Sequence, residues 1–246
     1  QSKTLALTTF LLLYPKEEKI KKWLQPVKFE SPMYEEADAK YEEFMTQLRK
    51  EAKFLKKYGG EIDLWKLKEG PKRKAGFRAQ KWFFEMLMDL NVVSSSELKA
   101  KTYSLPDKLS DKLLRFDLRK LELSLDEWKE LYYKVAIKPD IDIQKLGRVE
   151  IKCIGPDDEI FKIKKIAWNH NPSMFVVVVR RCDEDLTEFQ FLGWLYGFEV
   201  YSLELEKADG YSTHADFYFG KLKQLRKPKM FLKKLLQASK ANPKIS

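Results

Sequence analysis

The sequence predicts an α/β protein in which a mixed β-sheet is flanked by helices and preceded by a helical region. Apolar residues recur at spacings of three and four between residues 34 and 58, as in an amphipathic helix. Residues 76–90 are so rich in Phe, Trp, Met and Leu that a second, largely buried helix is predicted there. From residue 135 onward β-branched residues dominate, and residues 174–180 form a continuous apolar run typical of a buried central strand.

Composition narrows the class of protein. The 246 residues are 44% hydrophobic and 34% charged, which predicts a globular core and excludes a disordered chain. The net charge of +10 makes nucleic acid the expected partner. Two cysteines cannot form a disulfide framework, and no apolar run near the start can cross a bilayer, so a cytoplasmic location without membrane contact is expected. High Lys and Glu with few Asn and Gln indicate a thermophilic source.

The first half of the chain is predicted to be helical. Residues 3–26 form one or two short helices interrupted by prolines, and the helix of residues 34–58 ends at a Gly-Gly pair. Residues 68–74 form a loop, so the chain divides into a helical N-terminal region, residues 1–70, and a larger domain, residues 71–246. Between residues 94 and 134 short helices are expected. Capping-box spacings of Ser and Glu mark two of their starts, at Ser94 with Glu97 and at Ser124 with Glu127.

The second half is predicted to form the sheet. A hairpin is expected from strands at residues 135–143 and 148–154 with a turn at residues 144–147, while residues 160–168 look helical or irregular. The remaining elements are strands at residues 174–180, 188–196 and 216–219 and a helix at residues 229–238.

The predicted hairpin places acidic side chains on one face of the sheet. Glu150 and Lys152 are two positions apart in a strand, so they point to the same face, and the residues between them point to the core. If the turn centres on residue 145, Asp140 lies opposite Glu150; if it centres on residue 146, Asp142 does. In either register an aspartate shares the face of Glu150 and Lys152.

Two carboxylates that converge in this way repel each other unless a cation lies between them. Hard oxygen ligands favour Mg²⁺ or Mn²⁺. A metal held there can bind a phosphate oxygen and lower the pKa of a bound water, and Lys152 can stabilise developing negative charge. This pattern predicts a phosphodiester-cleaving site.

The hairpin residues resemble a known family. Pro139-Asp140, nine intervening residues and then Glu150-Ile151-Lys152 are similar to the signature of the PD-(D/E)XK, or restriction-endonuclease-like, nucleases. The resemblance implies a restriction-endonuclease-like core within residues 71–246 and a Mg²⁺- or Mn²⁺-dependent deoxyribonuclease. It implies Asp140, Glu150 and the carbonyl of Ile151 as metal ligands and Lys152 as the catalytic lysine. Such nucleases often work as dimers, so a homodimer is compatible with it.

Two further likenesses lie outside the hairpin. Gly76-Phe-Arg-Ala-Gln80 resembles the start of the first helix in archaeal Holliday-junction resolvases, where the helix supplies a third acidic ligand. Here that position is Gln80, which can position a water or offer its carbonyl oxygen but adds no charge, and Glu85 is the nearest alternative acid. Trp168, the strand at residues 175–179 and Gly193-Trp194-Leu195 resemble the tail of small viral and plasmid nucleases. The missing acid leaves a rival function open: a DNA-binding protein that keeps the nuclease fold without the chemistry.

Basic residues outside the hairpin are candidates for nucleic-acid contact, although a solvated turn or face would look the same. They are Lys72, Arg73, Lys74, Arg78, Lys162, Lys164 and Lys165. Other site types are disfavoured: the chain has only two histidines, no zinc-type spacing of Cys and His, and no phosphate-binding glycine loop.

Overall fold

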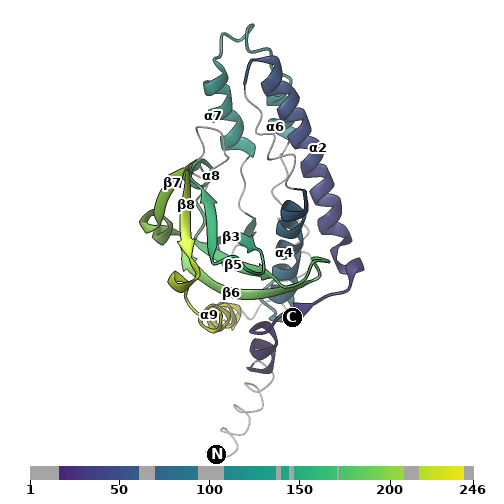
Figure 1. Ribbon diagram of the computed structural model, residues 1–246, viewed down its shortest axis with the longest axis vertical. Helices are drawn as coiled ribbons and strands as arrows, with labels where there is room; N and C mark the ends of the chain where they lie inside the picture. Colours follow the sequence, from purple (N-terminus) through teal and green to yellow (C-terminus); the bar gives the residue numbers. More distant parts are fainter. Residues whose placement is uncertain are drawn as a thin grey trace, which may run out of the picture.

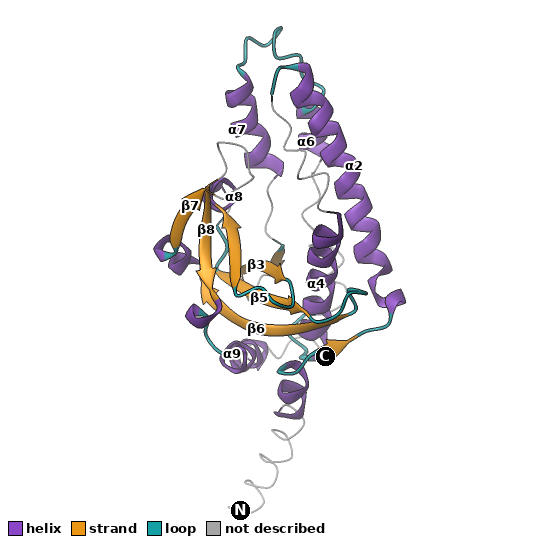
Figure 2. Ribbon diagram, viewed as in Figure 1, coloured by secondary structure: helices purple, strands orange, loops and turns teal. Residues whose placement is uncertain are grey.

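The computed structural model describes residues 17–60, 70–93, 108–136, 140–143, 147–170, 172–207 and 216–240, and over these residues the chain is α/β (Figures 1 and 2). A helical segment at residues 17–23 comes first. The helices that follow are α2 (Glu35–Lys57), α4 (Gly70–Asp89), α6 (Lys108–Leu113), α7 (Leu125–Ala136), α8 (Lys165–His170) and α9 (Pro228–Lys240). Short 3-10 helices are η1 (Ser31–Tyr34), η2 (Gly197–Ser202) and η3 (Leu222–Gln224).

The larger sheet is mixed, as predicted. Among the described residues its strand order is β1-β6-β5-β3-β2, with β3 and β5 parallel and every other pair antiparallel. Its strands are β1 (Val27–Lys28), β2 (Ile141–Ile143), β3 (Gly147–Ile154), β5 (Phe175–Arg181) and β6 (Glu188–Tyr196). A second sheet has the order β4-β8-β7, with β4 (Ile160–Lys164), β7 (Glu204–Lys207) and β8 (Asp216–Lys221). The strands predicted near residues 148–154, 174–180, 188–196 and 216–219 are therefore confirmed.

The two faces of the larger sheet are covered differently. Val149 and Val177 point to the face on which α4 and α9 pack, beside Phe83 and Phe231. Figure 1 shows α9 under β6 and α4 beside the curled sheet. Alternate residues point to the other face, where the sheet β4-β8-β7 and α8 pack against Val176 and Val178. The predicted flanking helices thus cover mainly one face, and the second sheet covers most of the other.

The core beside α4 draws residues from both sides of the predicted boundary at residue 70. Trp23 packs edge-to-face on Trp82 at 5.2 Å between ring centroids, and Tyr34 packs on Phe189 of β6. All four rings belong to one hydrophobic cluster. Because each is large and fully or almost fully buried, the N-terminal residues contribute to the same core as the sheet.

The second half of α2 packs with α6 and α7 in a separate hydrophobic cluster, which we call the helical arm. Phe54 of α2 stacks on Trp128 of α7, at 4.2 Å between centroids, and Trp128 donates a hydrogen bond to the carbonyl of Leu113 in α6 (3.0 Å). Ser124 and Glu127 form the predicted capping box at the start of α7. Figure 1 shows this arm projecting away from the sheets, at the end of the molecule opposite α9.

Three predicted elements need correction. Residues 160–164 form strand β4, because Phe161 and Ile163 alternate into the core while Ile160 and Lys162 face outward. Residues 70–74 belong to α4 instead of a loop, since a proline is tolerated in a helix's first turn. Val135 lies in the last turn of α7 instead of opening a strand, and it packs with the arm at helical spacing from Trp128 and Tyr132. Three regions for which elements were predicted lie outside the described residues: residues 1–16, the capping box at residues 94–97 and the hairpin turn at residues 144–146.

Candidate active site

The hairpin register aligns Asp140 with Glu150. Asp140 directly precedes β2, and the register that pairs Ile141 with Val149, extended by one residue, places Asp140 opposite Glu150. Asp142 instead aligns with Arg148, and its side chain is 55% exposed with the carboxylate 3.8 Å from the guanidinium. The structure therefore brings Asp140, and not the alternative Asp142, to Glu150.

Asp140 is held in place by two donors from different elements. It is 8% exposed. One carboxylate oxygen accepts a hydrogen bond from the backbone N–H of Ile151 in β3 (2.6 Å), and the other accepts one from Nε2 of Gln80 in α4 (2.5 Å). Helix α4 and the two hairpin strands thus converge on one buried carboxylate. Gln80 and Ile151 both contact Asp140, although Ile151 does so through its N–H and not through the carbonyl that the resemblance implied as a ligand.

Glu150 and Lys152 form an ion pair on the same face of β3. The Lys152 ammonium donates a hydrogen bond to Glu150 Oε1, and the side chains are 20% exposed for Glu150 and 25% exposed for Lys152. Positions two apart in a strand share a face, so this pair follows directly from β-strand geometry. Water therefore has only partial access to the pair.

The charges of this group are strongly coupled. Burial raises the pKa of Asp140 well above its usual range, and the negative charge of Glu150 raises it further, against the opposing effects of Lys152 and the Ile151 N–H. Burial alone would lower the pKa of Lys152, but the charges of Glu150 and Asp140 overcome burial, and its pKa is raised. Lys152 is therefore a cation at neutral pH and cannot act there as a free base.

The donor set suits a divalent cation with hard oxygen preference. Asp140 and Glu150 supply carboxylates, and Oε1 of Gln80 is buried without a hydrogen-bond partner in the described part of the chain. The orphaned amide oxygen and the repulsion that Glu150 exerts on Asp140 are both costs that a cation would relieve. Among the described residues no group of three or more His, Cys, Asp and Glu side chains converges, so no third acidic side chain joins Asp140 and Glu150 there. The residues present therefore fit Mg²⁺ or Mn²⁺ with oxygen ligands of mixed charge.

Glu85, the alternative acid, is turned away from the hairpin. It lies five residues after Gln80 on α4, which corresponds to about 140° around the helix. Its carboxylate pairs with Lys81 at 2.9 Å, and Lys81 also approaches Glu36 of α2. Glu85 therefore belongs to the contact between α4 and α2.

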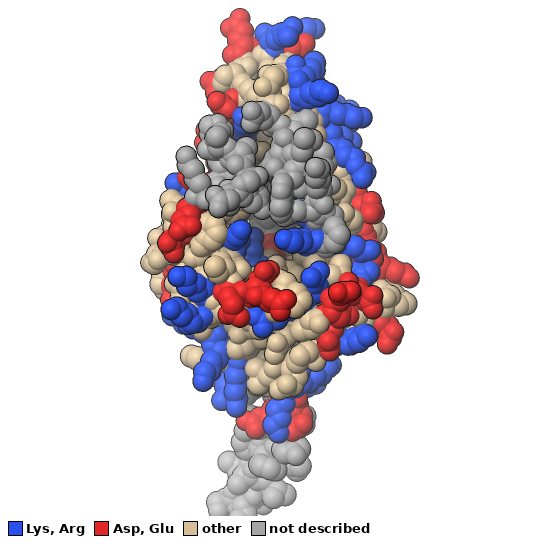
Figure 3. All heavy atoms as spheres, viewed as in Figure 1, with Lys and Arg blue, Asp and Glu red and all other residues tan. Residues whose placement is uncertain are grey.

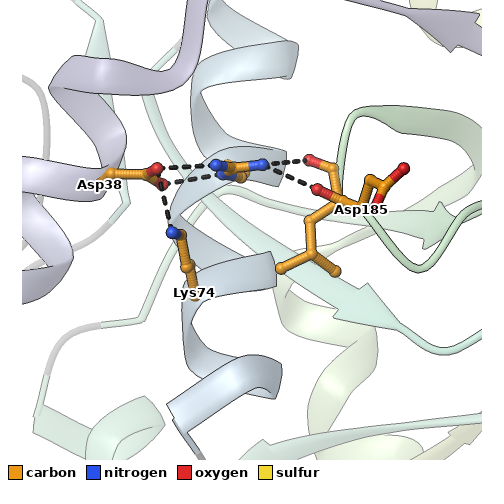
Figure 4. Close-up of polar contacts among 5 residues, drawn as sticks. Asp38, Lys74 and Asp185 are labelled. Carbon is orange, nitrogen blue, oxygen red and sulfur yellow. Dashed lines mark hydrogen bonds and ion pairs between the residues drawn. The ribbon is translucent and has the colours of Figure 1, made fainter. Parts of the chain in front are cut away.

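The prediction that Arg78 contacts nucleic acid needs correction, because Arg78 is 7% exposed. Its guanidinium donates two hydrogen bonds to the carboxylate of Asp38 in α2, at 2.8 and 2.7 Å. It also donates to the carbonyls of Asp185 (2.9 Å) and Leu186 (3.2 Å) in the β5–β6 connection. Figure 4 shows Asp38 and Lys74 on one side of the guanidinium and Asp185 on the other. Arg78 is thus a structural cross-link, and its charge is already neutralised.

The other predicted basic residues fall into two groups. Lys72, Arg73 and Lys74 lie on the first turns of α4, where Lys74 pairs with Asp38 at 3.1 Å. Lys162 and Lys164 lie on β4 over aromatic rings, at 5.3 Å from Phe219 and 5.8 Å from Tyr133. Lys165 begins α8 and is 3.5 Å from the carboxylate of Asp216.

One further basic group, which was not predicted from the sequence, lies on the helical arm. It consists of Lys50, Lys53, Lys57 and Arg115. The spacing of the three lysines, i, i+3 and i+7, was the available signal, since it places them on one face of α2.

No family model matches the chain, and neither the curated proteins nor the solved structures gave a match. In the part of the chain that the structure describes, no helix has both the length and the apolar character needed to cross a membrane.

Proposed function

We propose that this protein is a metal-dependent nuclease that hydrolyses phosphodiester bonds in DNA. The observation that supports the proposal is the buried carboxylate of Asp140, which is aligned with Glu150 and bonded to Gln80 of α4. Lys152 adds a positive charge on the same face. This arrangement agrees with the ligand set and lysine that the hairpin motif implied, and the net charge of +10 suits a polyanionic substrate.

Each residue has a distinct role in the proposed reaction. Asp140, Glu150, the Gln80 amide oxygen and the Ile151 carbonyl would hold Mg²⁺ or Mn²⁺. When bound, such a cation neutralises charge on a phosphate oxygen and lowers the pKa of a bound water. The Ile151 N–H and the Gln80 amide fix the orientation of Asp140. Lys152, a cation held beside Glu150, stabilises the negative charge that develops on the phosphate as water attacks.

A second candidate is a DNA-binding protein that does not cleave. The observation that favours it is the amide at position 80: only two carboxylates converge among the described residues, and two give weaker charge neutralisation than three. In that case the same basic surface would bind DNA through its backbone, with affinity that falls steeply as salt rises.

The proposal also gives the expected setting of the protein. Both cysteines are free thiols, in line with a reducing, cytoplasmic location. The proposal includes a homodimer only because the nucleases that the hairpin motif resembles often work as dimers. Light scattering of the purified chain would measure its oligomeric state.

Cleavage of supercoiled plasmid in Mg²⁺, in Mn²⁺ and in EDTA tests the proposal. The wild-type chain is expected to cleave only with metal. Glu150→Gln, which removes one of two ligand charges, is expected to lower the cleavage rate by about 100-fold or more. It should also weaken Mn²⁺ binding measured by calorimetry. Glu204→Gln, an exposed acid on β7, is the matched control and should change neither quantity.

Two results would contradict the nuclease proposal. Salt-sensitive DNA binding without cleavage in either metal would favour the non-cleaving protein. Metal-dependent cleavage that is the same in Glu150→Gln as in the wild type would place the active site elsewhere.

A further inference from the structure

A cleft of about 420 Å³ opens on the helical arm, between α2 and the residues around the end of α6. Lys50, Lys53 and Lys57 line it from α2, and Arg115 lines it from the opposite wall. Phe54 and Phe116 also line it. Figure 3 shows Lys and Arg side chains gathered along the outer edge of the molecule that α2 forms.

The charge of this cleft is unbalanced. Asp111 is its one lining carboxylate, and it is already shared between Lys50 at 3.0 Å and Arg115 at 3.3 Å. Within the described ranges no carboxylate lies at ion-pair distance from Lys53 or Lys57. The lining therefore carries four cations and one anion, while Asp117 and Arg119 act on Lys57 from outside it with opposite charges. Because walls of low dielectric concentrate the field, such a concavity attracts anions more strongly than scattered lysines do.

The cleft is built on a rigid support. Phe54 stacks on Trp128, which is fully buried and stacks in turn on Tyr132. The hydrogen bond from Trp128 to the Leu113 carbonyl ties the wall that carries Arg115 to the same stack. Binding an extended anion here would therefore order side chains only, and not the backbone.

The spacing of the lysines suits a nucleic-acid strand. Seven residues of helix separate Lys50 from Lys57, a distance of about 10 Å. One strand of duplex DNA places a phosphate about every 3.4 Å along the axis, so the row of lysines spans about three nucleotide steps. A small anion would engage only part of such a row.

The cleft also lies within reach of the candidate active site. Trp128, beneath the cleft, is eight residues before the end of α7, or about 12 Å along the helix. Asp140 follows that end by four residues, which span at most about 14 Å. The backbones of Trp128 and Asp140 are therefore at most about 26 Å apart, less than one turn of duplex DNA, which is about 34 Å.

We propose that this cleft binds the sugar–phosphate backbone of duplex DNA and thereby holds the substrate across the active site. The choice of DNA as the ligand rests on the proposed function. The cleft adds binding and positioning at a distance from the chemistry, and it reads no base sequence, because phosphate contacts are the same for every sequence.

The test is the salt dependence of DNA binding. A fluorescent 20-base-pair duplex is titrated with protein in EDTA, so that no cleavage occurs, over a series of salt concentrations. The double variant Lys53→Gln/Lys57→Gln is expected to reduce the slope of log affinity against log salt by about 2, because each of the two lysines would neutralise one phosphate. The matched control is Arg49→Gln/Lys56→Gln, which removes the same charge from exposed cations of α2 that do not line the cleft. Both variants change exposed side chains only, and circular dichroism verifies that each is folded.

The outcomes separate this inference from the proposed function. A slope that is unchanged in the cleft variant overturns the inference, while metal-dependent cleavage by the wild type would still support a nuclease. A slope that falls equally in the control variant also overturns it, because net charge alone would then explain the effect. A fall confined to the cleft variant supports the inference even if plasmid cleavage is never observed.

Discussion

Lys152→Ala is expected to slow Mg²⁺-dependent cleavage of DNA by roughly 10²–10³-fold, the loss typical when one preorganised charge is removed from an active site. The ammonium is fixed beside Glu150, and its raised pKa keeps it charged. Because Lys152 is not a metal ligand in the proposed reaction, Mn²⁺ affinity should fall much less than in Glu150→Gln. Single-turnover cleavage rates and calorimetric Mn²⁺ titrations measure the two quantities separately.

The same variant has a second expected effect on the metal-free protein. Removing Lys152 leaves the carboxylates of Asp140 and Glu150 without their shared counter-charge, so thermal unfolding in EDTA should occur at a lower temperature. Added Mn²⁺ should recover part of the loss, because it binds only the folded site. Lys28→Ala, which changes an exposed lysine of strand β1, is the control for both effects. An unchanged cleavage rate in Lys152→Ala would refute the catalytic role of Lys152. A rate that falls only because Mn²⁺ no longer binds would mean that Lys152 supports the metal ligands and does not stabilise the reacting phosphate.

Arg78→Met is expected to lower the free energy of unfolding by about 3 kcal/mol, the scale for breaking a mostly buried ion pair by removing one partner. Asp38 would lose both guanidinium hydrogen bonds, and two carbonyls of the β5–β6 connection would lose their donor. Methionine preserves most of the side-chain length, so the change reports on the polar contacts more than on packing. Urea unfolding with an unchanged m value would measure it.

Lys74→Met is the matched control for this prediction, since Lys74 binds the same carboxylate from a position that is 35% exposed. We expect it to change the free energy of unfolding by less than about 1 kcal/mol. A destabilisation equal to that of Arg78→Met would contradict the special role of the guanidinium.

Burial acts to raise the pKa of Asp38, but hydrogen bonds from Arg78 and Lys74 outweigh it, and the pKa is lowered. The stability that ionised Asp38 contributes is therefore present above its unfolded pKa, near 4, and is lost as pH falls through the lower folded value.

The hairpin could be predicted from the sequence only up to its register. Strand periodicity placed an aspartate on the face of Glu150 and Lys152, but parity is the same whether Asp140 or Asp142 lies opposite Glu150. In the structure Asp140 takes this position, and it is hydrogen-bonded there by Gln80, sixty positions earlier in the chain, and by the N–H of Ile151. Information of that kind is tertiary and cannot be read from a short window of sequence.

Two other misreadings have the same cause. Arg78 looked like a surface cation because its partners, Asp38 and the carbonyl of Asp185, lie 40 and 107 positions away in the chain. Strand β4 was missed because its alternation spans only five residues, and its partner β8 begins more than fifty residues later. By contrast, α2 and β5 have long periodic or continuous apolar patterns that specify them locally, and both were predicted within two residues of their bounds.

The alignment of Asp140 with Glu150 limits how this chain can change length. Nine residues separate the two carboxylates in the sequence, and strand side chains alternate between faces. One residue gained or lost within β2, or in β3 before Glu150, would move either the carboxylate or the buried Ile141 to the wrong face of the sheet. Single-residue insertions and deletions should therefore be excluded from these strand segments, where the number of residues matters as much as their identity.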